Sequence, residues 1–207
     1  PNHDEPDKEN GDSAFRNLSR ESFTQPPLEA LTRGTRAHLK VQDGCDFMCA
    51  FCIIPRARGR ARPRRLDNLL VEAESLADAG VRELVLTGVN LGTYQDGEAN
   101  LVQVVDALAA LDGIARVRIS SIEPTTVDSA LLERMADPRH RLVPFLHLPL
   151  QSGSNRVLRH MRRRYDAAEF CAFAEQALAQ VPGLCLGTDV MAGHPGEDLA
   201  AFDETVN

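Results

Sequence analysis

The stretch "HLKVQDGCDFMCAFC", residues 38–52, joins a short apolar run to a loop that contains three cysteines. Its first six residues predict a β-strand, and the remaining nine predict the loop that follows it. The cysteines have the spacing C-x3-C-x2-C at Cys45, Cys49 and Cys52. The stretch therefore predicts a strand whose carboxyl end leads into a loop with three clustered cysteines.

The same alternation continues along the chain. Short apolar runs follow one another with amphipathic segments between them, which is typical of repeated βα units. Asn100 is placed to cap one predicted helix, and Asp166 and Glu169 form a pair typical of a capping box. Strands are predicted at residues 38–43, 83–87, 116–122, 145–150 and 185–193. Helices are predicted at residues 67–79, 100–113 and 166–180, with another beginning at 197.

Polar and glycine-rich motifs follow each predicted strand. In parallel α/β folds, the loops at the carboxyl ends of the strands carry the functional site. The motifs are, in chain order, "DGCDFMCAFC", "TGVNLGTY", "SIEP", "QSGS" and "AGHPGE". We therefore expect an α/β fold, a parallel barrel or partial barrel, with its site at one end. Because a barrel that stops after a fifth strand leaves an open edge, we expect a fragment of a larger protein.

Composition narrows the class of protein. A chain of 207 residues suits one domain. Residues 1–34 are polar and lack sustained periodicity, which predicts a linker or disordered arm before a folded domain at 35–207. The net charge of −7 argues against a simple nucleic-acid-binding domain, although two basic stretches create local positive fields. Five cysteines, without a signal peptide or a spanning segment, predict a cytoplasmic protein with reduced thiols and no membrane partner.

The clustered cysteines allow three interpretations. Three thiolates can bind three irons of a cubane cluster and leave the fourth iron free for a cofactor. A structural zinc ion requires a fourth ligand, and the nearest histidine, His38, lies on the strand seven residues before Cys45. Unliganded thiols are the third reading, but buried cysteines are usually scattered. Cys171 and Cys185 are scattered in this way, and we predict that they pack in the core.

Phe51 directly precedes the third cysteine. With it, the loop resembles the radical S-adenosylmethionine enzymes, whose motif C-x3-C-x-aromatic-C follows the first strand of a partial (βα)6 barrel. The resemblance implies a 4Fe–4S cluster held by Cys45, Cys49 and Cys52, with S-adenosylmethionine chelated at the open iron. It also implies reductive cleavage of that cofactor to a 5′-deoxyadenosyl radical, which abstracts hydrogen from an unactivated carbon.

Further segments narrow the resemblance over residues 35–207. "LVLTGVNLGTY", "RVRISSIEP", "FLHLPLQSGSNRVLRHMRRRY" and "TDVMAGHPGE" look like successive motifs of the methylthiotransferases. The pairing of "QDGC" with "TGVNLG" and "ISSIEP" is most similar to the branch that acts on threonylcarbamoyl-adenosine beside the tRNA anticodon. The implied partners are tRNA and an electron donor such as a flavodoxin or ferredoxin. The alternative substrates are isopentenyl-adenosine and a ribosomal-protein aspartate.

The chain also departs from that family. Full-length members carry an N-terminal domain with three further cysteines for a second 4Fe–4S cluster, the sulfur source, and a small C-terminal RNA-binding β-barrel. No cysteine precedes Cys45, and the chain ends before a sixth strand. We therefore expect a radical core that is truncated before the last strand and lacks ligands for the second cluster. The alternative from another class is a catalytically incomplete iron–sulfur or RNA-binding fragment.

Residues at the predicted barrel mouth are expected to hold S-adenosylmethionine. Asn90 and Gln151 are predicted to hydrogen-bond its amino-acid moiety, Glu123 its ribose hydroxyls and Arg162 its carboxylate, while the backbone near Gly193 borders adenine. The alternative is that these residues only form turns and cap helices. The full set of predicted cofactor-binding residues is Phe51, Gly88, Asn90, Glu123, Gln151, Ser152, Arg162 and Gly193.

"RARGRARPRR", residues 56–65, follows the cysteine loop. Its position would let guanidinium groups reach a phosphate backbone near the site, whereas the alternative is a solvated basic loop. The predicted RNA-binding residues are Arg56, Arg58, Arg60, Arg62, Arg64 and Arg65.

His147 lies in the predicted strand at 145–150. It is predicted either to point into the barrel or to be a histidine whose hydrogen bonds are satisfied in the core.

Overall fold

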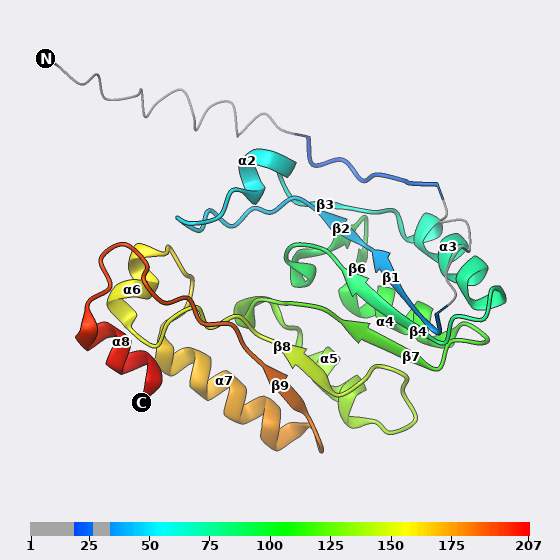
Figure 1. Ribbon diagram of the computed structural model, residues 1–207. Helices are drawn as coiled ribbons and strands as arrows, with labels where there is room; N and C mark the ends of the chain where they lie inside the picture. Colours follow the sequence, from blue (N-terminus) through cyan, green and yellow to red (C-terminus); the bar gives the residue numbers. More distant parts are fainter. Residues whose placement is uncertain (1–18, 27–33) are drawn as a thin grey trace, which may run out of the picture.

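The computed structural model describes residues 19–26 and 34–207 (Figure 1). Its strands are β1 (Arg36–Lys40), β2 (Gln42–Asp43), β3 (Arg62–Pro63), β4 (Glu83–Thr87), β5 (Gln95–Asp96), β6 (Ala99–Asn100), β7 (Arg116–Ile119), β8 (Phe145–His147) and β9 (Cys185–Gly187). Its α-helices are α2 (Ile54–Arg58), α3 (Leu66–Asp78), α4 (Leu101–Ala110), α5 (Ser129–Ala136), α6 (Asn155–His160), α7 (Ala167–Gln180) and α8 (Leu199–Val206). Two short 3₁₀ turns are η1 (Leu91–Thr93) and η2 (Pro124–Thr126).

Parallel strands form the framework, as the sequence predicts. β1, β4 and β7 are hydrogen-bonded in that order, and β8 pairs in parallel with β9. Isolated parallel bridges join Val117 to Leu142 and Ser121 to His147, so β8 lies beside β7. A strand is present at each predicted place, and the α/β class is confirmed.

β4 has its predicted bounds, whereas β7, β8 and β9 end before their predicted carboxyl ends. The first predicted strand divides into β1 and β2, and β2 pairs antiparallel with β3. Beyond β9, the ladder is interrupted at Thr188, whose hydroxyl accepts from the Leu150 amide and donates to the Leu148 carbonyl. Backbone pairing resumes at Gln151. The loops that carry the polar motifs begin at these irregular strand ends.

The core lies between the strands and the helices α3, α4, α5 and α7 (Figure 1). In β1, Ala37 and Leu39 are buried, whereas Arg36 and His38 are exposed, which is the two-residue period of a strand with one covered face. Leu69 of α3 and Leu108 of α4 are fully buried against this face. The helices therefore cover one face of the sheet, and the polar residues of β1 lie on the other.

The predicted helices at 67–79, 100–113 and 166–180 are confirmed with small differences at their ends. Both predicted caps are present: Asn100 forms a capping box with Gln103, and Asp166 forms one with Glu169. α5 was not predicted, although Asp128 caps its first turn. Among the described residues, no helix has the length and apolar character needed to cross a membrane.

Two predictions about cysteines are wrong. Cys171 and Cys185 are both exposed rather than packed in the core. Cys171 lies on the solvent side of α7, whose buried face is formed by Phe170, Ala174 and Ala177. An amphipathic pattern predicts which face of a helix is buried. A cysteine at the edge of that face can be either buried or exposed, and the pattern does not distinguish the two.

The prediction of a linker or disordered arm at residues 1–34 lies mostly outside the described residues. Residues 19–26 are described, and they are attached to the domain. The Phe23 amide donates to the Pro63 carbonyl at 3.0 Å, and the Arg65 amide donates to the Phe23 carbonyl at 3.0 Å. The Lys40 ammonium also lies 5.5 Å from the centre of the Phe23 ring. This part of the segment therefore adds to the edge at β3.

Glu83 forms an ion-pair cluster on the polar face of the sheet. Its carboxylate is almost fully buried and lies 3.2 Å from Arg36 Nε, 3.0 Å from Arg116 Nε and 2.8 Å from Arg118 Nε. Burial raises the pKa of Glu83, but hydrogen bonds from Arg118, Arg116 and Arg36 outweigh burial and hold it below its usual value. The carboxylate is therefore more stable ionised in the folded chain than in the unfolded chain.

Replacing Glu83 by glutamine should lower the free energy of unfolding at neutral pH by about 2 kcal/mol, because three guanidinium groups lose their common partner. Since the folded pKa is depressed, the ionised form stabilises the fold above the unfolded pKa, and this contribution is lost as pH falls through the folded pKa. Urea titrations of both proteins should therefore converge in acid. A difference that stays constant between pH 7 and pH 3 would contradict this role.

Candidate functional site

A loop between β2 and α2 carries the three clustered cysteines. Gly44 begins it with φ +68°, and a Cβ atom there would lie 2.0 Å from the Arg60 carbonyl oxygen. Only glycine allows this approach, which lets the Cys45 amide donate to the Gly59 carbonyl at 3.1 Å. A second tight turn follows, in which the Cys52 amide donates to the Cys49 carbonyl at 3.1 Å. The two turns gather the three thiols on one short loop.

All three thiols are free of disulfides, and each lies partly or fully below the surface. Burial, with a smaller contribution from the nearby thiols of Cys49 and Cys52, raises the pKa of Cys45 to about 11, although a hydrogen bond from the Phe47 amide opposes this rise. Burial also raises the pKa of Cys49, which the Arg163 guanidinium partly offsets. These mutual effects place the three sulfurs within electrostatic reach of one another. Metal binding here requires thiolates and so releases protons.

The donor set suits a cluster better than a single ion. In the part of the chain that the structure describes, no three His, Cys, Asp or Glu side chains are gathered closely enough to hold one metal ion. Each thiolate of a cubane cluster binds a different iron. Three free thiols on one short loop are a donor set for three irons of such a cluster.

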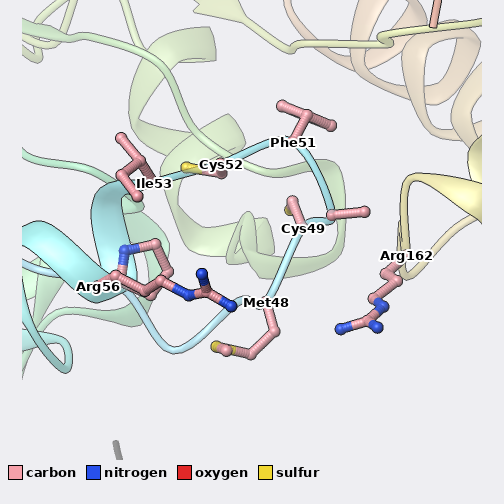
Figure 2. Close-up of a pocket in the computed structure, with 9 residues that line it drawn as sticks. Met48, Cys49, Phe51, Cys52, Ile53, Arg56 and Arg162 are labelled. Atoms are coloured by element: carbon pink, nitrogen blue, oxygen red, sulfur yellow. The ribbon is translucent and has the colours of Figure 1, made fainter. Parts of the chain in front are cut away.

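A cavity of about 290 Å³ opens beside the cysteine loop (Figure 2). Figure 2 shows the side chains of Arg56 and Arg162 on opposite sides of Met48. Arg162 has φ +58°, a backbone conformation that costs a non-glycine residue on the order of 1 kcal/mol. The cavity therefore has cysteines in its wall and positive charge on two sides. Its lining residues are Met48, Cys49, Ala50, Phe51, Cys52, Ile53, Pro55, Arg56 and Arg162.

Asn90, which follows β4, is buried with one hydrogen-bonding group unpaired. Its Oδ1 accepts from the Thr126 hydroxyl at 3.0 Å, but its buried Nδ2 has no partner. Its backbone amide donates to Gln42 Oε1 at 3.2 Å, and Gly88 lies so close to Gln42 and Leu91 that a Cβ there would collide with both. An unpaired buried donor costs about 1–3 kcal/mol, so Nδ2 is a group that a ligand can satisfy.

Glu123 belongs to a buried network that reaches the cysteine loop through Arg163. Its carboxylate accepts from Arg163 Nη2 at 2.5 Å, and the same nitrogen donates to the Tyr165 hydroxyl at 2.7 Å and the Pro149 carbonyl at 3.2 Å. Burial raises the pKa of Glu123, and Arg163 opposes that rise. Arg162, Arg163 and Arg164 are consecutive in the sequence. The sequence argument selected Arg162 and missed Arg163, because only packing distinguishes adjacent arginines.

The loop after β8 is arranged differently from the prediction. Gln151 has φ +70°, and its backbone pairs with residues 189–191. Ser152 is fully buried, and its hydroxyl hydrogen-bonds Thr205 of α8 at 3.1 Å. The assignment of Ser152 to the cofactor site is therefore corrected: this side chain ties the loop to α8. Ser154, at the start of α6, makes no capping bond.

Phe51 of the cysteine loop contacts the residue that follows the predicted Gly193. The Phe51 ring lies edge-on to the ring of His194, with 6.4 Å between centroids, and His194 directly follows Gly193. His194 is largely buried, and its Nδ1 has no partner. The glycine turn after β9 is thus brought against the cysteine loop.

The six predicted RNA-binding arginines are separated by their surroundings. Arg56, Arg58 and Arg65 are exposed, and Arg60 and Arg62 are partly buried. Asp43 lies 3.6 Å from Arg58 and 3.8 Å from Arg62.

The structure corrects the prediction made for Arg64. Its side chain is 0% exposed and forms an ion pair with Glu72 of α3. Its Nε donates to Asn68 Oδ1 at 2.7 Å, and its Nη2 donates to the Asn68 and Gln25 carbonyls at 3.2 Å and 3.4 Å. A side chain enclosed in this way cannot reach a nucleic acid, so the prediction that Arg64 binds RNA is wrong.

His147 joins two polar residues that the sequence did not connect. Its Nδ1 lies 2.8 Å from the Ser121 hydroxyl, and its Nε2 lies 3.4 Å from Asp189 Oδ1. The half-buried ring is on the polar face of β8 rather than in the hydrophobic core. Strand pairing supplies both partners, and no local motif could have indicated them.

The spacing, the free thiols and the strand that precedes them match a known family. Residues 39–207 match the family described as the radical SAM superfamily. The chain belongs to the radical SAM superfamily. Membership confirms the predicted resemblance and, with it, the two cofactors of the family, a 4Fe–4S cluster and S-adenosylmethionine.

Two curated relatives of this radical SAM chain carry the name threonylcarbamoyladenosine tRNA methylthiotransferase MtaB. The protein from Chlamydia pneumoniae is 38% identical over 185 residues, which cover 89% of this chain and 44% of the relative. The protein from Bacillus subtilis (strain 168) is 41% identical over 188 residues, which cover 89% of this chain and 42% of the relative. The chain therefore spans less than half the length of these relatives.

The solved structures support the fold of the radical SAM domain. The radical S-adenosylmethionine methyltransferase TsrM from Kitasatospora setae, solved with a SAM analogue, has a TM-score of 0.69 at 18% identity, covering 93% of this chain and 38% of TsrM. At this identity the likeness concerns the fold alone.

Proposed function

We propose that this chain is the radical core of a tRNA methylthiotransferase that acts on threonylcarbamoyl-adenosine beside the anticodon. The similarity to the MtaB enzymes over 89% of the chain carries the proposal. The parallel order of β1, β4 and β7, with β8 and β9 beside them, supports a partial (βα)6 barrel. Methylthiolation would replace a C–H bond of the modified base with a methylthio group.

Cys45, Cys49 and Cys52 would each bind one iron of the cluster. When bound, the cluster supplies the electron that cleaves S-adenosylmethionine. The unpaired Nδ2 of Asn90 and the guanidinium of Arg162 are the groups that we assign to the amino-acid moiety of that cofactor. Phe51, together with the backbone at Gly193, is assigned to its adenosine part.

The exposed arginines of α2 are proposed to face the tRNA. Arg56 and Arg58 follow Cys52 by a few residues, and both side chains are exposed. Guanidinium groups there can pair with phosphates, although Asp43 already lies near Arg58. A flavodoxin or ferredoxin would supply electrons. A cytoplasmic location is part of the proposal, since all five thiols are free.

Anaerobic reconstitution with iron and sulfide tests the proposal. We expect about four irons per chain and a spectrum that changes when S-adenosylmethionine is added. With a reductant, cleavage to 5′-deoxyadenosine should be faster with tRNA that carries threonylcarbamoyl-adenosine than with tRNA that carries isopentenyl-adenosine. It should also be faster than with a ribosomal-protein peptide containing the target aspartate. Stoichiometric zinc without a cluster would refute the site, and stimulation by either alternative substrate alone would reassign the branch.

A further inference from the structure

Arg163 contacts the sulfur of a cluster-binding cysteine directly. Its Nη1 donates to Cys49 Sγ at 3.5 Å, which is within range for a hydrogen bond to sulfur. The side chain is 3% exposed, so water does not compete for this contact. The other guanidinium nitrogens are held by Glu123, Tyr165 and the Pro149 carbonyl, which leaves Nη1 directed at the sulfur.

We propose that Arg163 is a positioning residue that holds the Cys49 thiolate and makes the bound cluster easier to reduce. The inference rests on the proposed function, because it requires Cys49 to bind iron. Hydrogen bonds to cluster sulfurs and nearby charge set the reduction potential of such centres. A donor that carries positive charge stabilises the added electron, so the reduced form gains more from Arg163 than the oxidised form does.

The charge of Arg163 is permanent and its orientation is fixed. Burial lowers the pKa of Arg163, but Glu123 and Tyr165 raise it more, so the guanidinium stays protonated. The guanidinium carbon also lies 4.9 Å from the centre of the Tyr165 ring. Glu123 accepts from Nη2 of the guanidinium, whereas the Cys49 sulfur accepts from Nη1. Arg163 and Glu123 therefore have opposite effects on the potential of the cluster.

The segment around Arg163 also braces the cysteine loop on both sides of Cys49. The Ala50 amide donates to the Met161 carbonyl at 3.1 Å. The guanidinium carbon of Arg164 lies 3.8 Å from the centre of the Phe47 ring. The segment that links α6 to α7 thus contacts the loop at Phe47, Cys49 and Ala50. The hydrogen bond to the sulfur is therefore made between two segments held in a defined register.

The test is the reduction potential of the reconstituted cluster without S-adenosylmethionine. The variants are Arg163→Gln, Arg163→Lys and Glu123→Gln, with Arg159→Gln as the matched control. Arg159 lies on α6 and is exposed, so its replacement removes the same charge where water screens it. Iron content is measured first, and the reduced cluster is then followed by electron paramagnetic resonance during a redox titration.

For Arg163→Gln, we expect the ratio of reduced to oxidised cluster at a fixed potential to fall about tenfold, which is 59 mV for one electron. Arg163→Lys should recover part of this loss, Glu123→Gln should raise the ratio, and Arg159→Gln should leave it unchanged. Equal ratios for Arg163→Gln and Arg159→Gln overturn the inference. If Arg163→Gln does not retain iron, an unchanged or lower ratio for Glu123→Gln overturns it. A wild-type chain that binds no cluster refutes the proposed function instead.

Discussion

Replacing Cys49 by alanine should abolish the iron–sulfur cluster. Three thiolates are the minimum set that the loop provides, and the described part of the chain offers no arrangement of His, Cys, Asp or Glu as a substitute metal site. After anaerobic reconstitution, iron content should fall from about four per chain to below about one, with loss of the visible absorption of the cluster. Cleavage of S-adenosylmethionine should disappear with it.

Cys171→Ala is the control for this loss. Cys171 is a free, exposed cysteine on α7, so its removal changes the number of thiols without touching the loop. Its iron content should match that of the unmodified chain. If Cys171→Ala lost the cluster while Cys49→Ala retained it, the ligand assignment would be wrong.

Replacing Arg64 by glutamine should destabilise the domain by about 3–5 kcal/mol, because it leaves the buried carboxylate of Glu72 without its charged partner. The change also removes bonds to the Gln25 and Asn68 carbonyls, which connect α3 and residues 19–26 to β3. Urea unfolding followed by circular dichroism measures the loss.

Arg56→Gln is the matched control, since it makes the same chemical change at an exposed position of α2. Its free energy of unfolding should change by less than about 0.5 kcal/mol. Its affinity for tRNA should instead fall, and the salt dependence of binding should become shallower. The double change Arg64→Gln with Glu72→Gln should recover part of the stability lost by Arg64→Gln. Equal stability of the two single variants would show that Arg64 is not buried in solution.

The sequence predicted the regular elements well where local signals agree. The buried strand β4 and the capped helices α4 and α7 combine a clear period with a turn or a capping residue. α5 was missed because its segment is short, and Asp128 is a weak signal without a longer apolar period. The predicted ends of β8 and β9 were too long because side-chain bonds from Thr188 interrupt the ladder there.

The candidate site was predictable only where its chemistry lies in consecutive residues. Cys45, Cys49 and Cys52 form one loop, so their spacing alone indicated the donor set. The partners of Cys49 come from a segment more than a hundred residues away. Neighbours in an arginine run have the same composition, and only packing decides which one enters the interior.

The sequence by itself determined that this chain is an α/β protein with a three-thiol loop after its first strand, because strand periods, caps and cysteine spacing are local properties. Tertiary structure alone decided that Arg163 points at Cys49, that Arg64 is enclosed beside Glu72, and that Ser152 ties its loop to α8. The physical reason is that burial of a polar side chain is stable only when partners from other segments arrive with it. Those partners are specified by the pairing of distant segments and not by the residues on either side.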